Sequence, residues 1–97
     1  MSYSIRARGA TLAAALAAIT IVFDEQVVAH QPEHKADRKL MLDTAEGTGK
    51  LAVFPDDHDV EIVASGGLGW NGRNDDGSVN ITQANVSVQI YPVIRAP

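Results

Sequence analysis

The sequence predicts an α+β fold with the element order β-α-α-β-β, in which a three-stranded, mainly antiparallel sheet carries two helices packed on one face. Three observations lead to this. First, apolar and polar residues alternate near the amino terminus and again from residue 59 onward, as in strands. Second, apolar residues recur every three or four positions between residues 11 and 54, as in helices. Third, no linker or internal repeat divides the 97 residues, so we expect a single domain over 1–97.

The first strand is predicted over residues 3–9, "YSIRARG". Tyr3, Ile5 and Ala7 alternate there with polar residues, which is the period of a half-buried strand. Gly9 ends it.

The first helix is predicted from Thr11, which suits an N-cap. Its apolar stripe recurs at intervals of three and four, at Leu12, Leu16, Ile19, Phe23 and Val27. Pro32 ends this helix near His30 and fits the first turn of the next one.

The same segment has an alternative interpretation. Arg6 and Arg8 precede the apolar run 11–23, an arrangement that resembles a secretion signal. The run is too short to span a bilayer, and it continues into Asp24 and Glu25 without a clean cleavage site. Its removal would also take the first strand and half of the helical layer, so we expect a retained core helix.

The second helix is predicted from about Pro32 to about Val53. Its stripe consists of Leu40, Thr44, Gly47, Leu51 and Phe54. Gly47 and Gly49 each cost about 1 kcal/mol in a helix interior, so a break near Gly47 is the alternative. We expect one continuous helix, with Gly47 allowing a close approach of the first helix.

The last two strands form a predicted hairpin. One face of the first of them carries Val60, Ile62, Ala64, Gly66, Leu68 and Trp70, and this register predicts that Trp70 packs in the core. Residues 71–78, "NGRNDDGS", are rich in turn signals. The alternation of the final strand slips at Thr82 to Gln83, which predicts a β-bulge.

The glycines of this hairpin have the spacing of a nucleotide-binding loop. Gly67, Gly69 and Gly72 match G-x-G-x-x-G. That fingerprint binds a pyrophosphate only when a helix follows the glycines, and here a turn and a strand follow. We therefore expect the glycines to serve the strand and the hairpin, and we expect no cofactor.

The histidines offer two further motifs. His30 and His34 match H-x-x-E-H, but Pro32 interrupts the helix that a zinc site needs, so we expect a helix corner with two solvated histidines. An enzyme would have to use His58 with Asp56 or Asp59.

The acidic loops and the composition exclude other chemistry. The carboxylates of 56–59 and 74–76 lack the spacing of a calcium loop and are expected to be solvated turns. The chain has no cysteine, which excludes disulfides and thiolate zinc sites. No nucleophile is coupled to a base. We therefore predict a non-enzymatic protein with no catalytic residues and no metal.

The charge and the strand edges indicate what the chain binds. A net charge of −4 with scattered basic residues argues against nucleic acid, and no segment suggests a membrane partner. The outward positions of the last strand are polar and uncharged, so pairing with another chain is expected at Asn85, Ser87, Gln89 and Tyr91. The loop offers a second candidate contact, formed by Trp70, Asn71 and Arg73. The expected partner is the chain itself, as a homo-oligomer, or a larger protein assembly.

Three segments carry a resemblance to a known group of proteins: "SYSIRARGAT" before the alanine-rich helix, "FDEQVVAHQPEHKADR" at the helix junction, and "ITQANVSVQIYPV" at the end of the sheet. The chain resembles small, mostly uncharacterised proteins encoded by tailed phages and prophages of GC-rich bacteria. It departs from them at "EGTGK", where an uninterrupted helix would be expected.

The resemblance implies a role in virion assembly, in the cytoplasm of a bacterial host or on the virion itself. The alternative that it implies is interference with host defence, by binding a host protein or by sequestering a small nucleotide near the glycines of 66–72.

Overall fold

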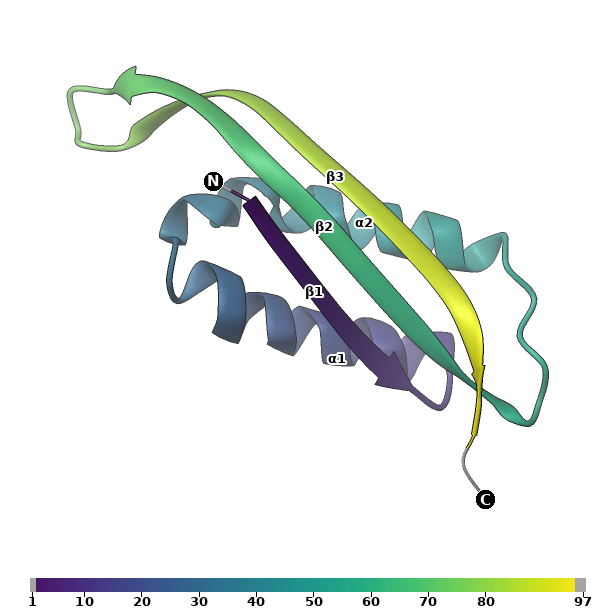
Figure 1. Ribbon diagram of the computed structural model, residues 1–97. Helices are drawn as coiled ribbons and strands as arrows, with labels where there is room; N and C mark the ends of the chain where they lie inside the picture. Colours follow the sequence, from purple (N-terminus) through teal and green to yellow (C-terminus); the bar gives the residue numbers. More distant parts are fainter. Residues whose placement is uncertain (1, 96–97) are drawn as a thin grey trace.

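The computed structural model describes residues 2–95 and has a three-stranded antiparallel sheet, in the order β1-β2-β3, with both helices on one face (Figure 1). This confirms the predicted fold class and element order. The elements are β1 (Ser2–Gly9), α1 (Leu12–Phe23), a π-helical turn η1 (Asp24–Val28), a 3-10 turn η2 (Pro32–His34), α2 (Lys35–Lys50), β2 (His58–Arg73) and β3 (Val79–Ile94).

α1 begins where the sequence predicts, but the α-helix ends at Phe23 and a π-helical turn continues it to Val28, short of the predicted end near His30. The hydroxyl of Thr11 accepts a hydrogen bond from the backbone N–H of Ala14 at 3.1 Å, which caps the helix. Ala15, Ile19 and Phe23 are buried, with Leu12 and Leu16 packed beside them at the edge of the core. The predicted stripe therefore faces the sheet.

α2 is continuous through both of its glycines and ends at Lys50, three residues before the predicted end. The expected role of Gly47 is wrong. A Cβ atom at Gly47 would meet nothing within 4 Å, whereas one at Gly49 would lie 2.5 Å from a methyl group of Leu12. Gly49 therefore lets the two helices approach each other.

The side of α2 that faces the core also differs from the prediction. Asp37, Met41, Ala45 and Gly49 are buried, whereas Leu40 is 41% exposed and Leu51 is 89% exposed. The buried side is rotated by about one residue from the apolar stripe because a polar pair occupies its first turn.

This pair is His34 with Asp37, and both side chains are fully buried. Nδ1 of His34 lies 3.2 Å from each carboxylate oxygen of Asp37, and its Nε2 lies 3.1 Å from Oε1 of Gln31. The ring also packs edge-on against Tyr3, which packs in the same way against Phe23. The expected solvated histidine is therefore wrong for His34, since the corner at Pro32 turns its ring under β1, while His30 is exposed.

The sheet register is regular along most of its length. β1 pairs with β2 from Ser2 opposite Gly67 to Gly9 opposite Val60. In the β2–β3 hairpin, Gly69 faces Gln83 and Trp70 faces Ile81, which leaves Thr82 as the extra residue of the predicted bulge.

The hairpin turn is shorter than predicted. β2 extends through Asn71 and Gly72 to Arg73, and the backbone N–H of Asn74 donates to the carbonyl of Ser78 at 2.7 Å. Gly72 and Gly77 have φ of +71° and +88°, the left-handed conformation that favours glycine. These two glycines therefore serve the bend of β2 and the turn.

The hairpin projects beyond the rest of the domain, because β2 and β3 have 16 residues each and β1 has eight (Figure 1). Trp70 lies on this overhang and is 42% exposed, so the prediction that it packs in the core is wrong. Alternation gives the face of β2 to which its side chain points, but the described pairing of β1 with β2 extends only to Gly67, opposite Ser2.

Replacement of Asp37 tests the buried pair. We expect Asp37→Ala to lower the free energy of unfolding by about 3 kcal/mol, because His34 then lacks its partner in the core. Asp43→Ala is the matched control, since Asp43 pairs with Lys39 on the exposed side of the same helix and should leave stability close to wild type. Urea unfolding followed by circular dichroism measures both. Equal effects of the two substitutions would contradict the importance of the buried pair.

Candidate functional site

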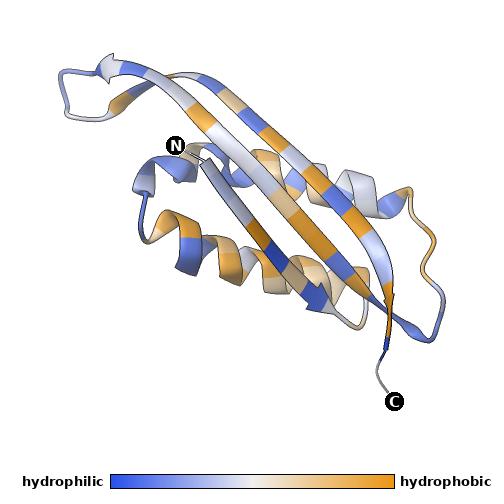
Figure 2. Ribbon diagram, viewed as in Figure 1, coloured by the Kyte–Doolittle hydropathy of each residue, from blue (hydrophilic) through white to orange (hydrophobic). Residues whose placement is uncertain are grey.

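β3 is an edge strand, and among residues 2–95 no strand pairs with its outer side. None of its 16 residues is charged. The predicted outward positions are exposed, while the residues between them, Val86, Val88 and Ile90, are half-buried against the helical layer (Figure 2). The structure therefore brings Asn85, Ser87, Gln89 and Tyr91 together on one exposed face, as the alternation predicts.

The opposite edge of the sheet is better protected against pairing. β1 has eight residues and carries Arg6 and Arg8 on its outer face. Short edge strands and charged side chains are devices that natural proteins use to prevent edge-to-edge association. In β3, only the bulge at Thr82 and Pro92 act in this way, which leaves residues 83–91 without such a device.

Tyr91 differs from the other three outward residues because it has a partner within the chain. Its hydroxyl donates to Glu61 at 2.9 Å, and Glu61 also accepts from Arg8 at 3.2 Å and pairs with Arg6 at 3.5 Å. The cluster joins all three strands across the outer face. The hydrogen bond from Tyr91, followed by that from Arg8, holds the pKa of Glu61 below its ordinary value.

Glu61 is not among the functional residues that the sequence predicts. The signal for it is that Glu61 lies in an alternating segment and that Arg6 and Arg8 occupy alternate positions of the first strand. Their contact depends on the register that sets Glu61 opposite both Arg8 and Tyr91. Tyr91 therefore helps to fix the sheet and is a weaker candidate for contact with a partner.

The predicted loop contacts divide in the same way. Trp70 and Asn71 are exposed on the overhang. Arg73 donates from Nη1 to the carbonyl of Gly77 at 3.0 Å and so closes the hairpin turn. Asp76 accepts from both the backbone N–H and the hydroxyl of Ser78, which is the solvated turn that the sequence predicts.

The carboxylates proposed as partners of His58 do not contact it. Nδ1 of His58 lies 2.6 Å from the neighbouring Asp57, while Asp59 pairs with Arg95 at 2.8 Å. Asp57 is 81% exposed, and its bond with His58 lowers its pKa. Asp56 shares with His58 only the wall of an open pocket of about 440 Å³.

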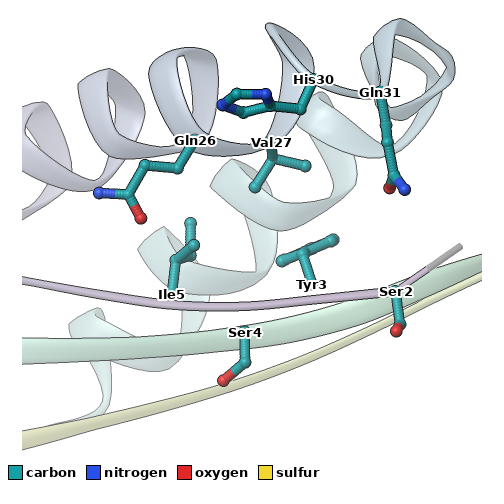
Figure 3. A pocket seen from close by; sticks show the side chains of 8 residues that line it. All are labelled: Ser2, Tyr3, Ser4, Ile5, Gln26, Val27, His30 and Gln31. Atoms are coloured by element: carbon teal, nitrogen blue, oxygen red, sulfur yellow. The ribbon is translucent and has the colours of Figure 1, made fainter.

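A second pocket, of about 360 Å³, lies between β1 and the helix junction (Figure 3). It is lined by Ser2, Tyr3, Ser4, Ile5, Gln26, Val27, His30 and Gln31. The hydroxyl of Tyr3 is buried there without a hydrogen-bond partner, and burial raises its pKa. The lining contains no carboxylate, so His30 has no acid beside it to form an acid–base pair.

Neither a metal centre nor a membrane-spanning helix occurs in the part of the chain that the structure describes. No three His, Cys, Asp or Glu side chains among residues 2–95 lie close enough together to hold a metal ion. No helix within the same residues has both the length and the apolar composition needed to cross a membrane.

Comparison with known proteins gives no relative: no family model, no curated protein and no solved structure matches this chain. The function must therefore be argued from the chain's own geometry.

The pH dependence of stability tests the cluster around Glu61. Folding lowers the pKa of Glu61 below its ordinary 4.5. Its contribution to the free energy of unfolding is therefore complete above pH 4.5 and is lost as the pH falls through the lower pKa of the folded state. We expect Glu61→Gln to destabilise the protein at pH 7 and to narrow its difference from wild type between about pH 5 and pH 3. Urea midpoints across this range measure the effect. Glu25→Gln, at an exposed position, is the control, and a difference independent of pH would contradict the assignment.

Proposed function

We propose that this chain is a small, non-enzymatic interaction protein that pairs the free edge of β3 with a strand of another chain, as a structural or assembly protein of a phage-type particle. One observation supports this most directly. Residues 83–91 form an uncharged run, exposed at alternate positions, on a strand whose outer side pairs with no strand among residues 2–95.

The physical argument concerns the backbone. An unpaired edge presents alternating N–H and C=O groups, and a strand from another chain satisfies them with a ladder of hydrogen bonds. The side chains then add selectivity, since Asn85, Ser87 and Gln89 point to one face and the valines between them to the other. An edge without charges carries no barrier to this pairing.

Neither of the two pockets described above supports catalysis as well as the edge supports binding. One lacks a carboxylate in its lining, and in the other the histidine pairs with a highly exposed carboxylate. Enzymes instead hold nucleophile, base and orienting group within hydrogen-bond reach of one another.

The phage context of the proposal rests on the resemblance of three segments of the sequence. The alternative role in defence against the host uses the same edge if the partner is a host protein. Its nucleotide-binding form has less support, because a Cβ at Gly66 would lie 2.5 Å from the carbonyl of Asn85 and 2.7 Å from the hydroxyl of Tyr3. That glycine is required by packing within the chain.

A lysine on the edge tests the proposal. We expect Gln89→Lys to weaken association with the partner strand at least about tenfold, because pairing would bring a strongly hydrated charge against the neighbouring strand. Ser4→Lys places the same charge on the same sheet face at the opposite edge and should have no effect. Light scattering coupled to gel filtration across a concentration series measures self-association, and co-sedimentation with phage-type particles measures docking. Unchanged association of Gln89→Lys in both assays would contradict the proposal.

A further inference from the structure

Two contacts fix which side of α2 faces α1. Arg38 forms a two-pronged bond with Asp24, at 2.7 and 2.9 Å, and Gly49 receives the side chain of Leu12. Since a helix turns by about 100° per residue, the opposite side carries Leu40, Thr44 and Gly47, and Leu51 follows directly after the last turn. Ala36, one turn before Leu40, lines a pocket with Arg73, Val79 and Ile81 of the hairpin.

This side of α2 lies over the free edge of the sheet. α1 packs on β1 and α2 packs on β3, so the side of α2 away from α1 points outward past β3. Figure 1 shows the carboxyl-terminal turns of α2 emerging beyond β3 on the side away from β1. We call residues 83–91 of β3, together with Leu40, Thr44, Gly47 and Leu51, the edge face, and these last four residues the α2 stripe.

The α2 stripe has the pattern of a buried surface but is not buried within this chain. Leu40 and Leu51 are 41% and 89% exposed, and there is open space beside Gly47. Four exposed charged residues of α2 lie on its other exposed side, away from the sheet: Lys39, Asp43, Glu46 and Lys50. Gly47 costs the helix about 1 kcal/mol and serves no contact inside the chain, which is explained if another helix approaches it.

The edge face fits a second copy of this chain better than an isolated peptide. A peptide strand added to β3 would satisfy the backbone and leave the α2 stripe in water. A partner that covers both must bring a strand with a helix above it, and a second β3 with its own α2 does so. The chain has a net charge of −4, so two copies repel each other in general, and the edge face carries no charged side chain.

Symmetry and register complete the geometry. Antiparallel pairing of β3 with itself creates a two-fold axis, which sets each edge face against its own copy. The uncharged run lies between the bulge at Thr82 and Pro92, and its centre is Ser87. Pairing centred there places Asn85 opposite Gln89, and the two-fold axis keeps both helical layers on the same side of the sheet.

The size of the edge face is sufficient for a dimer. Nine residues of strand extend about 30 Å, and one sheet layer with one helix layer is roughly 15 Å thick. Two such faces bury on the order of 1,000 Å² in total, near the lower limit for specific interfaces. A dimer of this size should dissociate on dilution.

We propose that two copies of this chain form a two-fold dimer in which β3 pairs antiparallel with β3 around Ser87 and the α2 stripes pack against each other, giving one six-stranded sheet. This rests on the proposed function and names its partner.

Cross-linking tests the register. The chain has no cysteine, so Ser87→Cys introduces a single thiol. Directly opposed residues in antiparallel strands have Cα atoms about 4.5–5.5 Å apart, within the range for a disulfide. We expect mild oxidation to convert Ser87→Cys almost completely to a covalent dimer. Ser65→Cys, on the same sheet face of the central strand opposite Ser87, should remain monomeric.

A helix substitution tests the α2 stripe. We expect Gly47→Glu to raise the dimer dissociation constant at least about tenfold, because two carboxylates would meet across the interface. The monomer should fold at least as well as wild type, since Glu is a better helix former and the space is open. Lys50→Gln changes the net charge by the same amount on the outer side of the helix and should leave the dissociation constant close to wild type.

The outcomes separate the dimer from the wider function. If Gln89→Lys weakens association but Ser87→Cys does not cross-link, the proposed dimer is overturned and strand pairing with another partner is left. Cross-linking with no effect of Gly47→Glu would overturn the helix contact. A chain that is monomeric at all concentrations would overturn the dimer, and the function would also fail if Gln89→Lys did not alter docking on particles.

Discussion

The buried pair of His34 and Asp37 determines how the rest of the domain is arranged. Both side chains are without solvent contact, and each would lose a hydrogen-bond partner in the core if the other turned away. α2 therefore has one acceptable rotation, with its first turn inward beneath Tyr3. Met41, Ala45 and Gly49 follow on the same side, and the helix settles against Leu12 of α1. The consequence is that the apolar stripe of Leu40 and Leu51 is left outside.

The length of the hairpin has a related effect on the sheet. β1 pairs with only part of β2, and at the far end Trp70 is 42% exposed. The bulge at Thr82 marks where this overhang begins, and the turn is closed by its own contacts at Arg73 and Asp76. Between the bulge and Pro92, β3 pairs with β2 without a break in register. The rotation of α2 leaves its apolar stripe exposed on the same side of the molecule as the regular, unpaired edge of β3.

The sequence predicts those features that depend on neighbours in the chain. The cap at Thr11, the stripe of α1, the bulge at Thr82 and the outward residues of β3 follow from local spacing, and the structure has them. The rotation of α2 could not be predicted in this way, since an apolar pattern assigns His34 and Asp37 to the surface. Trp70 shows a second limit, because alternation gives the face of a residue but not whether another element covers that face. The contacts of Glu61 depend on register across three strands and are invisible to spacing within one.

The misplaced stripe carries the most information about function. A sequence records every surface that its protein buries, including those buried against other molecules, whereas one copy of the chain shows only the internal ones. Where the pattern for burial at Leu40, Gly47 and Leu51 disagrees with exposure in the monomer, the difference points to a contact that the monomer lacks. The same side of the molecule holds an uncharged strand edge, on a chain with a net charge of −4. We therefore expect the contact to form through that edge. The net charge of −4 disfavours association between copies in general, and the edge face carries no charged side chain that would add to this repulsion.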